Sequence, residues 1–316
     1  MEAPLPNPES ATPRPWLVWI LGIITAEAVI ALLFTISYVV SQTIFPASRA
    51  YLPNLLLMPA VGGFAASYVW RKLRPTVTNV ILASLVITLA GLGIGSIFAG
   101  EGFICLLIVS PLFLISILTG ALLGRVLFKI DRSRLRLGFI PLFAIVALVE
   151  PSARTEKISV VTDTILIHAP PSRVWPETIS FKDIPVPSTF WLFRLGLPSP
   201  MATTSEGSFV KASRECIFSH NAVFKETVVQ FIPNQNLTFD ITDIPPDPEL
   251  VGHLTPHRGQ FLLRDNGDGT TTLSGSTWYT LHVRPNWYFE LWTKQIFRAV
   301  HLRVMEDIRR RAESAH

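Results

Sequence analysis

The side chains best suited to chemistry lie in two neighbouring segments of the second half of the chain. VKASRECIFS is followed by SHN and NAVFKETVVQF, which predicts two strands joined by a turn centred on His220. That centre pairs residues whose numbers sum to 440, so Arg214 lies opposite Glu226 and Cys216 lies opposite Phe224. Cross-strand partners share one face of a sheet. The arginine and the glutamate are therefore predicted to meet on the same side as an aromatic ring.

An arginine–glutamate pair on such a face has two interpretations. If the face lines a cavity, Arg214 and Glu226 hold a polar head group or orient a substrate carbonyl, although burying them costs several kcal/mol of desolvation. Otherwise they form an ion pair on the solvent face or at the margin of the sheet. The neighbouring guanidinium is expected to keep Glu226 ionised, which suits general acid–base work poorly. Cys216 is typical of a small buried apolar residue rather than a nucleophile.

Other motifs for chemistry are absent from the sequence. It contains no G-x-S-x-G, no H-E-x-x-H and no P-loop. His253 and His257 are four residues apart, but Pro256 between them disfavours the helical spacing of a metal pair, so we interpret both as loop histidines. Cys105 and Cys216 lie in different halves, which favours neither a disulfide framework nor a cysteine metal site. We therefore predict no metal and no cofactor.

The composition indicates a membrane protein. Hydrophobic residues make up 49% of the chain, charged residues only 16%, and the mean hydropathy is +0.41. Residues 1–149 hold ten basic and five acidic side chains, a net of +5, whereas residues 150–316 hold seventeen and eighteen, a net of −1. Basic loops beside apolar spans explain this asymmetry better than nucleic-acid binding does.

Four or five transmembrane helices are predicted over residues 16–149, after a disordered N-terminus at 1–15. A span needs about 20 residues, and the apolar runs are 16–40, 51–70, 77–99, 103–128 and a short fifth at 135–149. Counted over these runs, nine basic residues fall on one side and only Arg49 on the other, which places the basic side in the cytoplasm. The second half is extracytoplasmic if the fifth run crosses, and cytoplasmic if it does not.

Three features of this half invite a functional interpretation. Glu27 lies near the middle of the first run, and a carboxyl inside a membrane is by default a functional candidate. No basic residue occurs at matching depth, so we favour a protonated or hydrogen-bonded carboxyl between helices. The stretch GLGIGS and the pair Gly120 and Gly124 indicate close helix packing.

The second half begins after a polar linker at 150–156. ISVVTDTILIHAP has the β-branched composition of a strand, and PPSRVWPETI predicts a helix that starts at its prolines and buries Val174 and Trp175. IPVPSTFWLFRLG predicts a short helix, and NLTFDI predicts a further strand. GQFLLR and TTTLSGSTWYTLHV flank DNGDG, a strong hairpin signal.

The chain ends in a long amphipathic helix that begins at Pro285 and Asn286. Its apolar stripe at spacings of three and four consists of Phe289, Trp292, Ile296, Val300 and Val304. Such a stripe must be buried, and a curved sheet is the large surface available to it. His301 lies off this stripe and is predicted to be a surface residue.

This order, with IHAPPSRVW at its start and GSTWYTLHVRPNWYFELWTKQIF and HLRVMEDI at its end, resembles the SRPBCC superfamily over residues 157–313. That superfamily includes START lipid-binding domains, birch-pollen-allergen-like proteins and polyketide cyclases, all with a helix-grip fold. The sequence looks like a bacterial subgroup with membrane helices ahead of the domain. The resemblance implies an α+β domain with a hydrophobic cavity between a curved antiparallel sheet and the C-terminal helix. A fold alone does not give a function.

The combined prediction is a membrane-anchored domain that binds a hydrophobic small molecule or lipid, in a multi-pass protein of the bacterial inner membrane. One alternative is a polyketide-cyclase- or hydrolase-like enzyme that uses polar groups of the cavity, and another is a membrane-anchored sensor or assembly protein. The side chains predicted to line the cavity are Arg214, Cys216, Phe224, Glu226, Tyr279, Leu281, Trp292 and Ile296.

Overall fold

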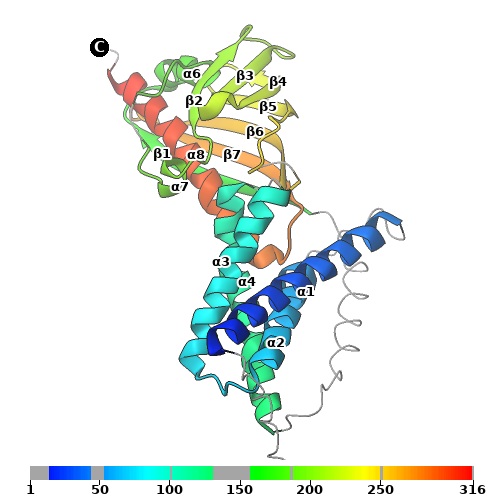
Figure 1. Ribbon diagram of the computed structural model, residues 1–316. Helices are drawn as coiled ribbons and strands as arrows, with labels where there is room; N and C mark the ends of the chain where they lie inside the picture. The colour runs from blue at the N-terminus through cyan, green and yellow to red at the C-terminus, as the bar shows by residue number, and fades with distance from the viewer. Residues whose placement is uncertain are drawn as a thin grey trace, which may run out of the picture. The chain divides into compact units, whose positions relative to one another are not determined.

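The computed structural model describes residues 14–43, 53–99, 102–130, 157–185, 188–249 and 252–314 (Figure 1). The chain divides into two compact units, Met1–Ala99 with Val109–Arg154, and Gly100–Ile108 with Thr155–His316. Some sequence predictions lie outside the described residues, namely those for residues 1–13, for the fifth run at 135–149 and for the linker at 150–156.

Apolar helices make up the described part of the first half of the chain. They are α1 (Pro15–Thr43), the π-helical turn η1 (Pro53–Leu57), α2 (Met58–Trp70), α3 (Val77–Ala99) and α4 (Phe103–Ile130). Three segments are long and apolar enough to cross a membrane: Pro15–Val39, Val77–Phe98 and Phe103–Lys129. Their bounds agree closely with the first, third and fourth predicted runs.

The described residues contain three candidates, so they do not support the predicted four or five spans, and the fifth predicted run lies outside them. The second run, 51–70, was predicted from its apolar length, but α2 has only 13 residues. At 1.5 Å per residue it reaches about 20 Å, well short of the ~30 Å hydrocarbon layer. Pro59 lies in the first turn of α2, a position where proline favours the start of a helix, so the regular helix begins late.

Glycines bring α2 and α4 into backbone contact, as the small-residue spacing predicts. A Cβ atom at Gly120 would lie 1.8 Å from the carbonyl oxygen of Ala60, and one at Gly63 would lie 2.1 Å from that of Ile117. The hydroxyl of Ser67 also donates to the carbonyl oxygen of Ala121 at 2.6 Å. A side chain at either glycine would force these helices apart.

Glu27 lies beside Gly91, where a Cβ atom would be 3.2 Å from its carboxyl oxygen. The carboxyl is therefore placed between α1 and α3, as predicted. Among the described residues, its Oε1 atom is buried without a hydrogen-bond partner.

The second unit contains a seven-stranded antiparallel sheet and one long helix. Its elements are β1 (Ile158–Ile167), α6 (Pro171–Ile179), α7 (Trp191–Arg194), β2 (Pro200–Ser205), β3 (Ser213–Phe218), η3 (Ser219–Asn221), β4 (Val223–Ile232), β5 (Asn236–Asp243), β6 (Leu254–Asp265), β7 (Thr271–Leu281) and α8 (Asn286–Ser314). The strand order is β1-β7-β6-β5-β4-β3-β2, so β1 and β2 form opposite edges. The edge strand β2 carries no clear signal in the sequence.

The predicted register of the central hairpin is confirmed. Arg214 pairs with Glu226 and Cys216 pairs with Phe224 across β3 and β4. The turn between the two strands is η3, in which His220 has a left-handed φ of 61°. The even-numbered residues Arg214, Cys216, Phe224 and Glu226 therefore share the inner face of these strands.

The start of the domain also follows the prediction. In α6, Val174 and Trp175 are buried, and Trp175 packs edge-on against Phe231 with ring centroids 5.1 Å apart. They join a core that β1, β4, β5, β6 and β7 share with the second half of α8, where Met305 and Ile308 are fully buried. Figure 1 shows α8 running across the sheet. A curled antiparallel sheet around a long terminal helix is the predicted helix-grip arrangement.

Candidate functional site

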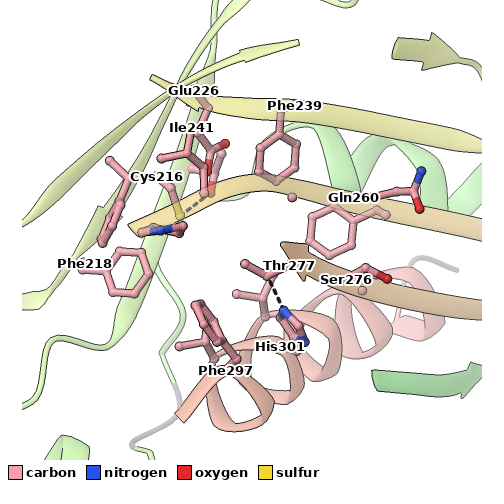
Figure 2. Close-up of a pocket in the computed structure, with 18 of the residues that line it drawn as sticks. Cys216, Phe218, Glu226, Phe239, Ile241, Gln260, Ser276, Thr277, Phe297 and His301 are labelled. Carbon is pink, nitrogen blue, oxygen red and sulfur yellow. Dashed lines mark hydrogen bonds between the residues drawn. The ribbon is translucent and has the colours of Figure 1, made fainter. Parts of the chain in front are cut away.

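A cavity of about 150 Å³ lies between the inner face of the sheet and α8. Side chains from β2 to β7 and from α8 line it, and the lining is mainly apolar and aromatic, including Phe218, Phe224, Phe239, Phe261 and Phe297. Figure 2 shows Cys216 and Glu226 on the strands, and Phe297 and His301 on the helix.

The structure brings five of the eight predicted residues to this cavity: Arg214, Cys216, Phe224, Glu226 and Ile296. The other three are not among its described lining. Tyr279 is fully buried against Phe297, with ring centroids 5.0 Å apart. Leu281 ends β7, and Trp292 packs with Tyr288 and Phe289 in an aromatic cluster at the start of α8.

Arg214 and Glu226 form a buried ion pair on the cavity wall. Their Nη1 and Oε2 atoms are 3.4 Å apart, and the two side chains are 2% and 6% exposed. The solvent-face alternative is therefore wrong, because the register directs both residues inward with Phe224. The guanidinium also lies 4.3 Å from the centre of the Phe239 ring, a cation–π contact.

The pair is incompletely satisfied by the protein. Among the described residues, Nε and Nη1 of Arg214 and Oε2 of Glu226 are buried without a hydrogen-bond partner. A buried polar atom left without a hydrogen bond costs about 1–3 kcal/mol. The protein therefore leaves polar atoms of two cavity-lining residues without a hydrogen bond.

Burial raises the pKa of Glu226 to about 7, and the charge of Arg214 offsets only part of that increase. Arg214 does favour the ionised form, as expected, but the effect of burial on the pKa is larger. The free energy lost when the carboxylate is removed from water exceeds the free energy gained from one imperfectly aligned guanidinium. Glu226 consequently titrates close to neutral pH.

Cys216 behaves as the predicted small apolar residue. Burial, with a smaller contribution from Glu226, raises the pKa of its thiol to about 12. The hydroxyl of Thr203 donates to the sulfur at 3.5 Å. A thiol that stays protonated at neutral pH is a poor nucleophile.

A second polar group of the cavity escaped the sequence analysis. His301 is 7% exposed, so the prediction of a surface position is wrong. Its Nδ1 atom lies 2.9 Å from Oδ2 of Asp163 on β1, and its Nε2 atom lies 2.8 Å from the hydroxyl of Thr277 on β7. The sheet curls around α8 and buries a wider face than the apolar stripe. The polar residues next to the apolar stripe were the feature of the sequence that could have indicated this wider buried face.

The two spaced histidines do not form a metal site in the part of the chain that the structure describes, where no group of three or more potential ligands occurs. His257 lies in β6, not in a loop as predicted. Its Nε2 atom is 2.7 Å from the hydroxyl of Thr280.

Comparisons with known proteins add structural likenesses only. No family model and no curated protein matches this chain. Norcoclaurine synthase from Thalictrum flavum, solved with dopamine and hydroxybenzaldehyde, is 12% identical, with 51% of this chain and 90% of that chain covered and a TM-score of 0.36.

Two further likenesses are to bacterial proteins. A protein from Nitrosospira multiformis is 18% identical over 49% of this chain and 97% of that chain, with a TM-score of 0.34. XoxI from Bacillus cereus is 14% identical over 49% of this chain and 96% of that chain, with a TM-score of 0.35. The description of the fold therefore rests on the strand order and the long helix of this chain.

Proposed function

We propose that the second unit binds a small, largely apolar molecule that carries a polar group, in a protein anchored to a membrane by its apolar helices. The observation that carries the proposal is the aromatic cavity with Arg214 and Glu226 buried in its wall and incompletely paired. Apolar walls with few polar groups are typical of small-molecule sites. The polar group of the ligand would accept from Arg214 or donate to Glu226.

The size of the cavity favours a single ring or a short chain over a whole lipid. Its volume of about 150 Å³ matches that of an engineered apolar cavity that binds benzene. Drug-sized ligands occupy about 300–1,000 Å³. A membrane lipid would require α8 to move away from the sheet. Anchoring still raises the local concentration of any ligand that partitions into the bilayer.

The proposal is tested with the full-length chain in lipid nanodiscs, titrated with methylcyclohexane and cyclohexanol by ligand-observed NMR. Saturable binding above that of empty nanodiscs is expected. Val300→Phe, which fills the cavity from α8, should weaken binding at least about tenfold. Val229→Phe is the matched control, because Val229 is 38% exposed and lies outside the cavity lining. Non-saturable uptake that is equal in all samples would reject the proposal.

The same preparation tests the lipid alternative. If organic extraction of the purified chain yields a stoichiometric lipid that Val300→Phe loses and Val229→Phe keeps, the ligand is a lipid and α8 opens to admit it.

A second candidate function, acid–base catalysis, is favoured by the position of Glu226. A carboxyl that titrates near pH 7 in an apolar cavity is suited to proton transfer. The pH profile of any turnover should then show a transition near pH 7 that Glu226→Gln abolishes. Tyr279, a polar residue predicted to line the cavity, lies outside its lining, so Tyr279→Phe should leave turnover unchanged.

The remaining predictions concern assembly and location. A sensor or assembly protein would be favoured by a cavity filled by its own side chains, and the cavity found here supports ligand binding instead. We also propose a multi-pass protein of the bacterial inner membrane. A reporter fused after His316 should show which side the second unit occupies.

A further inference from the structure

Asp163, His301 and Thr277 form a hydrogen-bonded chain that ends at the cavity. They come from β1, α8 and β7, and are 9%, 7% and 9% exposed. The carboxylate lies 2.9 Å from Nδ1 and the hydroxyl 2.8 Å from Nε2. Thr277 and His301 both line the cavity, and Figure 2 shows the bond between them.

With the imidazole of His301 neutral, the chemistry of the three groups sets the direction of both hydrogen bonds. A carboxylate only accepts, so Nδ1 of His301 must carry the proton and donate it to Asp163. A neutral imidazole has one N–H, so its Nε2 atom is then an acceptor. The proton of the Thr277 hydroxyl is therefore donated to His301. The hydroxyl oxygen of Thr277 can then only accept a hydrogen bond from a bound molecule.

We propose that Thr277 is a specificity-determining residue, which accepts a hydrogen bond from a hydroxyl group of the molecule in the cavity and offers no donor to a carbonyl or ether oxygen. Asp163 and His301 are positioning residues that hold the Thr277 proton away from the cavity. The inference rests on the proposed function and names the ligand class as a small apolar alcohol or phenol.

A second threonine–histidine pair, whose threonine also lies in β7, provides a matched control. Thr280 lies three residues after Thr277 in β7, and its hydroxyl is 2.7 Å from Nε2 of His257. Thr280 is also buried, but it is not among the residues that line the cavity. Replacing it removes the same kind of hydrogen bond without changing the cavity wall.

The experiment uses three single-ring probes with the full-length chain in nanodiscs at pH 8, above the range in which histidines usually ionise. Cyclohexanol can donate, cyclohexanone can only accept, and methylcyclohexane can do neither. Thr277→Val should weaken cyclohexanol binding about fivefold, the size of one ordinary hydrogen bond, and leave methylcyclohexane within about twofold. Thr277→Ser should retain the wild-type affinities, and Thr280→Val should change none of the three.

Asp163→Asn gives the sharper result because it reverses the direction of both hydrogen bonds. The amide of asparagine can donate to Nδ1, which moves the imidazole proton to Nε2 and turns Thr277 into an acceptor from His301. The threonine proton is then free for the cavity. Cyclohexanone should bind about fivefold more tightly than to wild type, and the advantage of cyclohexanol should disappear.

The outcomes separate this inference from the proposed function. Equal weakening of all three probes by Thr277→Val would show that the chain is only a structural link, and would overturn the inference. If Thr277→Val does not fold, Asp163→Asn decides, and an unchanged preference for cyclohexanol overturns the inference. If methylcyclohexane binds the wild type but no variant shifts the preference, only the inference fails. If no probe binds saturably, the proposed function fails and the inference fails with it.

Discussion

Two arginine–carboxylate pairs join neighbouring strands of the same sheet and differ in almost every physical respect. Arg258 and Asp240 lie directly opposite on β6 and β5, with Nε 2.6 Å from Oδ1 and side chains 47% and 39% exposed. Arg214 and Glu226 lie directly opposite on β3 and β4, but they are buried and 3.4 Å apart. The exposed pair has the shorter contact, and the buried pair has atoms without partners.

This difference indicates what each pair is for. An exposed pair is solvated whether or not it forms, so it adds at most about 1 kcal/mol to stability. A buried pair must recover its desolvation cost through good geometry, and Arg214 with Glu226 does so incompletely. The exposed pair is therefore in close contact, whereas the pair on the cavity wall is farther apart. This contrast is what we expect if a polar group of a ligand completes the buried pair.

The largest effect is expected from removing one partner of the buried pair. Arg214→Ala leaves Glu226 buried and uncompensated, and should lower the free energy of unfolding by about 3–5 kcal/mol at pH 8. Arg258→Ala should lower it by less than about 1 kcal/mol. Thermal unfolding of the full-length chain in one detergent measures both. Similar losses in the two variants would contradict the distinction between the pairs.

The pH dependence of stability gives the next largest effect. The pKa of Glu226 is about 7 in the folded chain and lies near 4.5 in a solvated one. Its contribution to stability is therefore fully present below about pH 4.5 and is lost as pH rises through 7. The loss amounts to roughly 3 kcal/mol, at 1.36 kcal/mol for each pKa unit.

Glu226→Gln should remove this dependence, since the amide does not titrate. Asp240→Asn is the control variant, and it should leave the decline between pH 5 and pH 8 unchanged. The melting temperature followed across that range provides the measurement. A decline that persists in Glu226→Gln would assign it to other groups.

The smallest loss of stability is expected when both buried partners are replaced by apolar residues. Arg214→Met with Glu226→Leu removes the desolvation cost and should leave stability unchanged or raise it by about 1–4 kcal/mol. The double variant should still bind methylcyclohexane but lose any preference for ligands whose polar group reaches this wall. A large destabilisation would mean that the pair is structural.

The site was partly predictable because a strand has a simple period. A turn centred on His220 sufficed to place Arg214 opposite Glu226, but it left open whether their face lines a cavity or meets solvent. The same alternation of side chains along a strand places Tyr279 on the inner face of β7. Alternation does not, however, predict how far along a strand the cavity extends. Tyr279 therefore lies beyond it, against Phe297.

His301 could not be placed from the apolar stripe of its helix. A stripe predicts the centre of a buried face, whereas a curled sheet also covers the flanks, and polar side chains there need partners from distant strands. Asp163 and Thr277 lie far from His301 in sequence and meet it only through the sheet order. Interactions of this kind depend on the order of the strands in the sheet, which cannot be predicted from the spacing of apolar residues.

The membrane half shows the opposite limitation. Among the described residues composition located the long helices well, since the three candidate spans match the first, third and fourth predicted runs. Composition overestimated the length of the helix formed by the second run, 51–70. The regular helix α2 has only 13 residues and begins just before Pro59, so it is shorter than the apolar run.

The pairing of β1 with β7 has a consequence for biosynthesis. Ile158 on β1 pairs with Thr280 on β7, so the first strand of the domain must wait for almost the last one to be made. Contacts this distant in sequence form slowly, and exposed strand edges invite aggregation meanwhile. During synthesis the apolar helices emerge first and β1 follows without its partner. If synthesis stops before β7, β1 lacks its partner and the sheet keeps an open edge there.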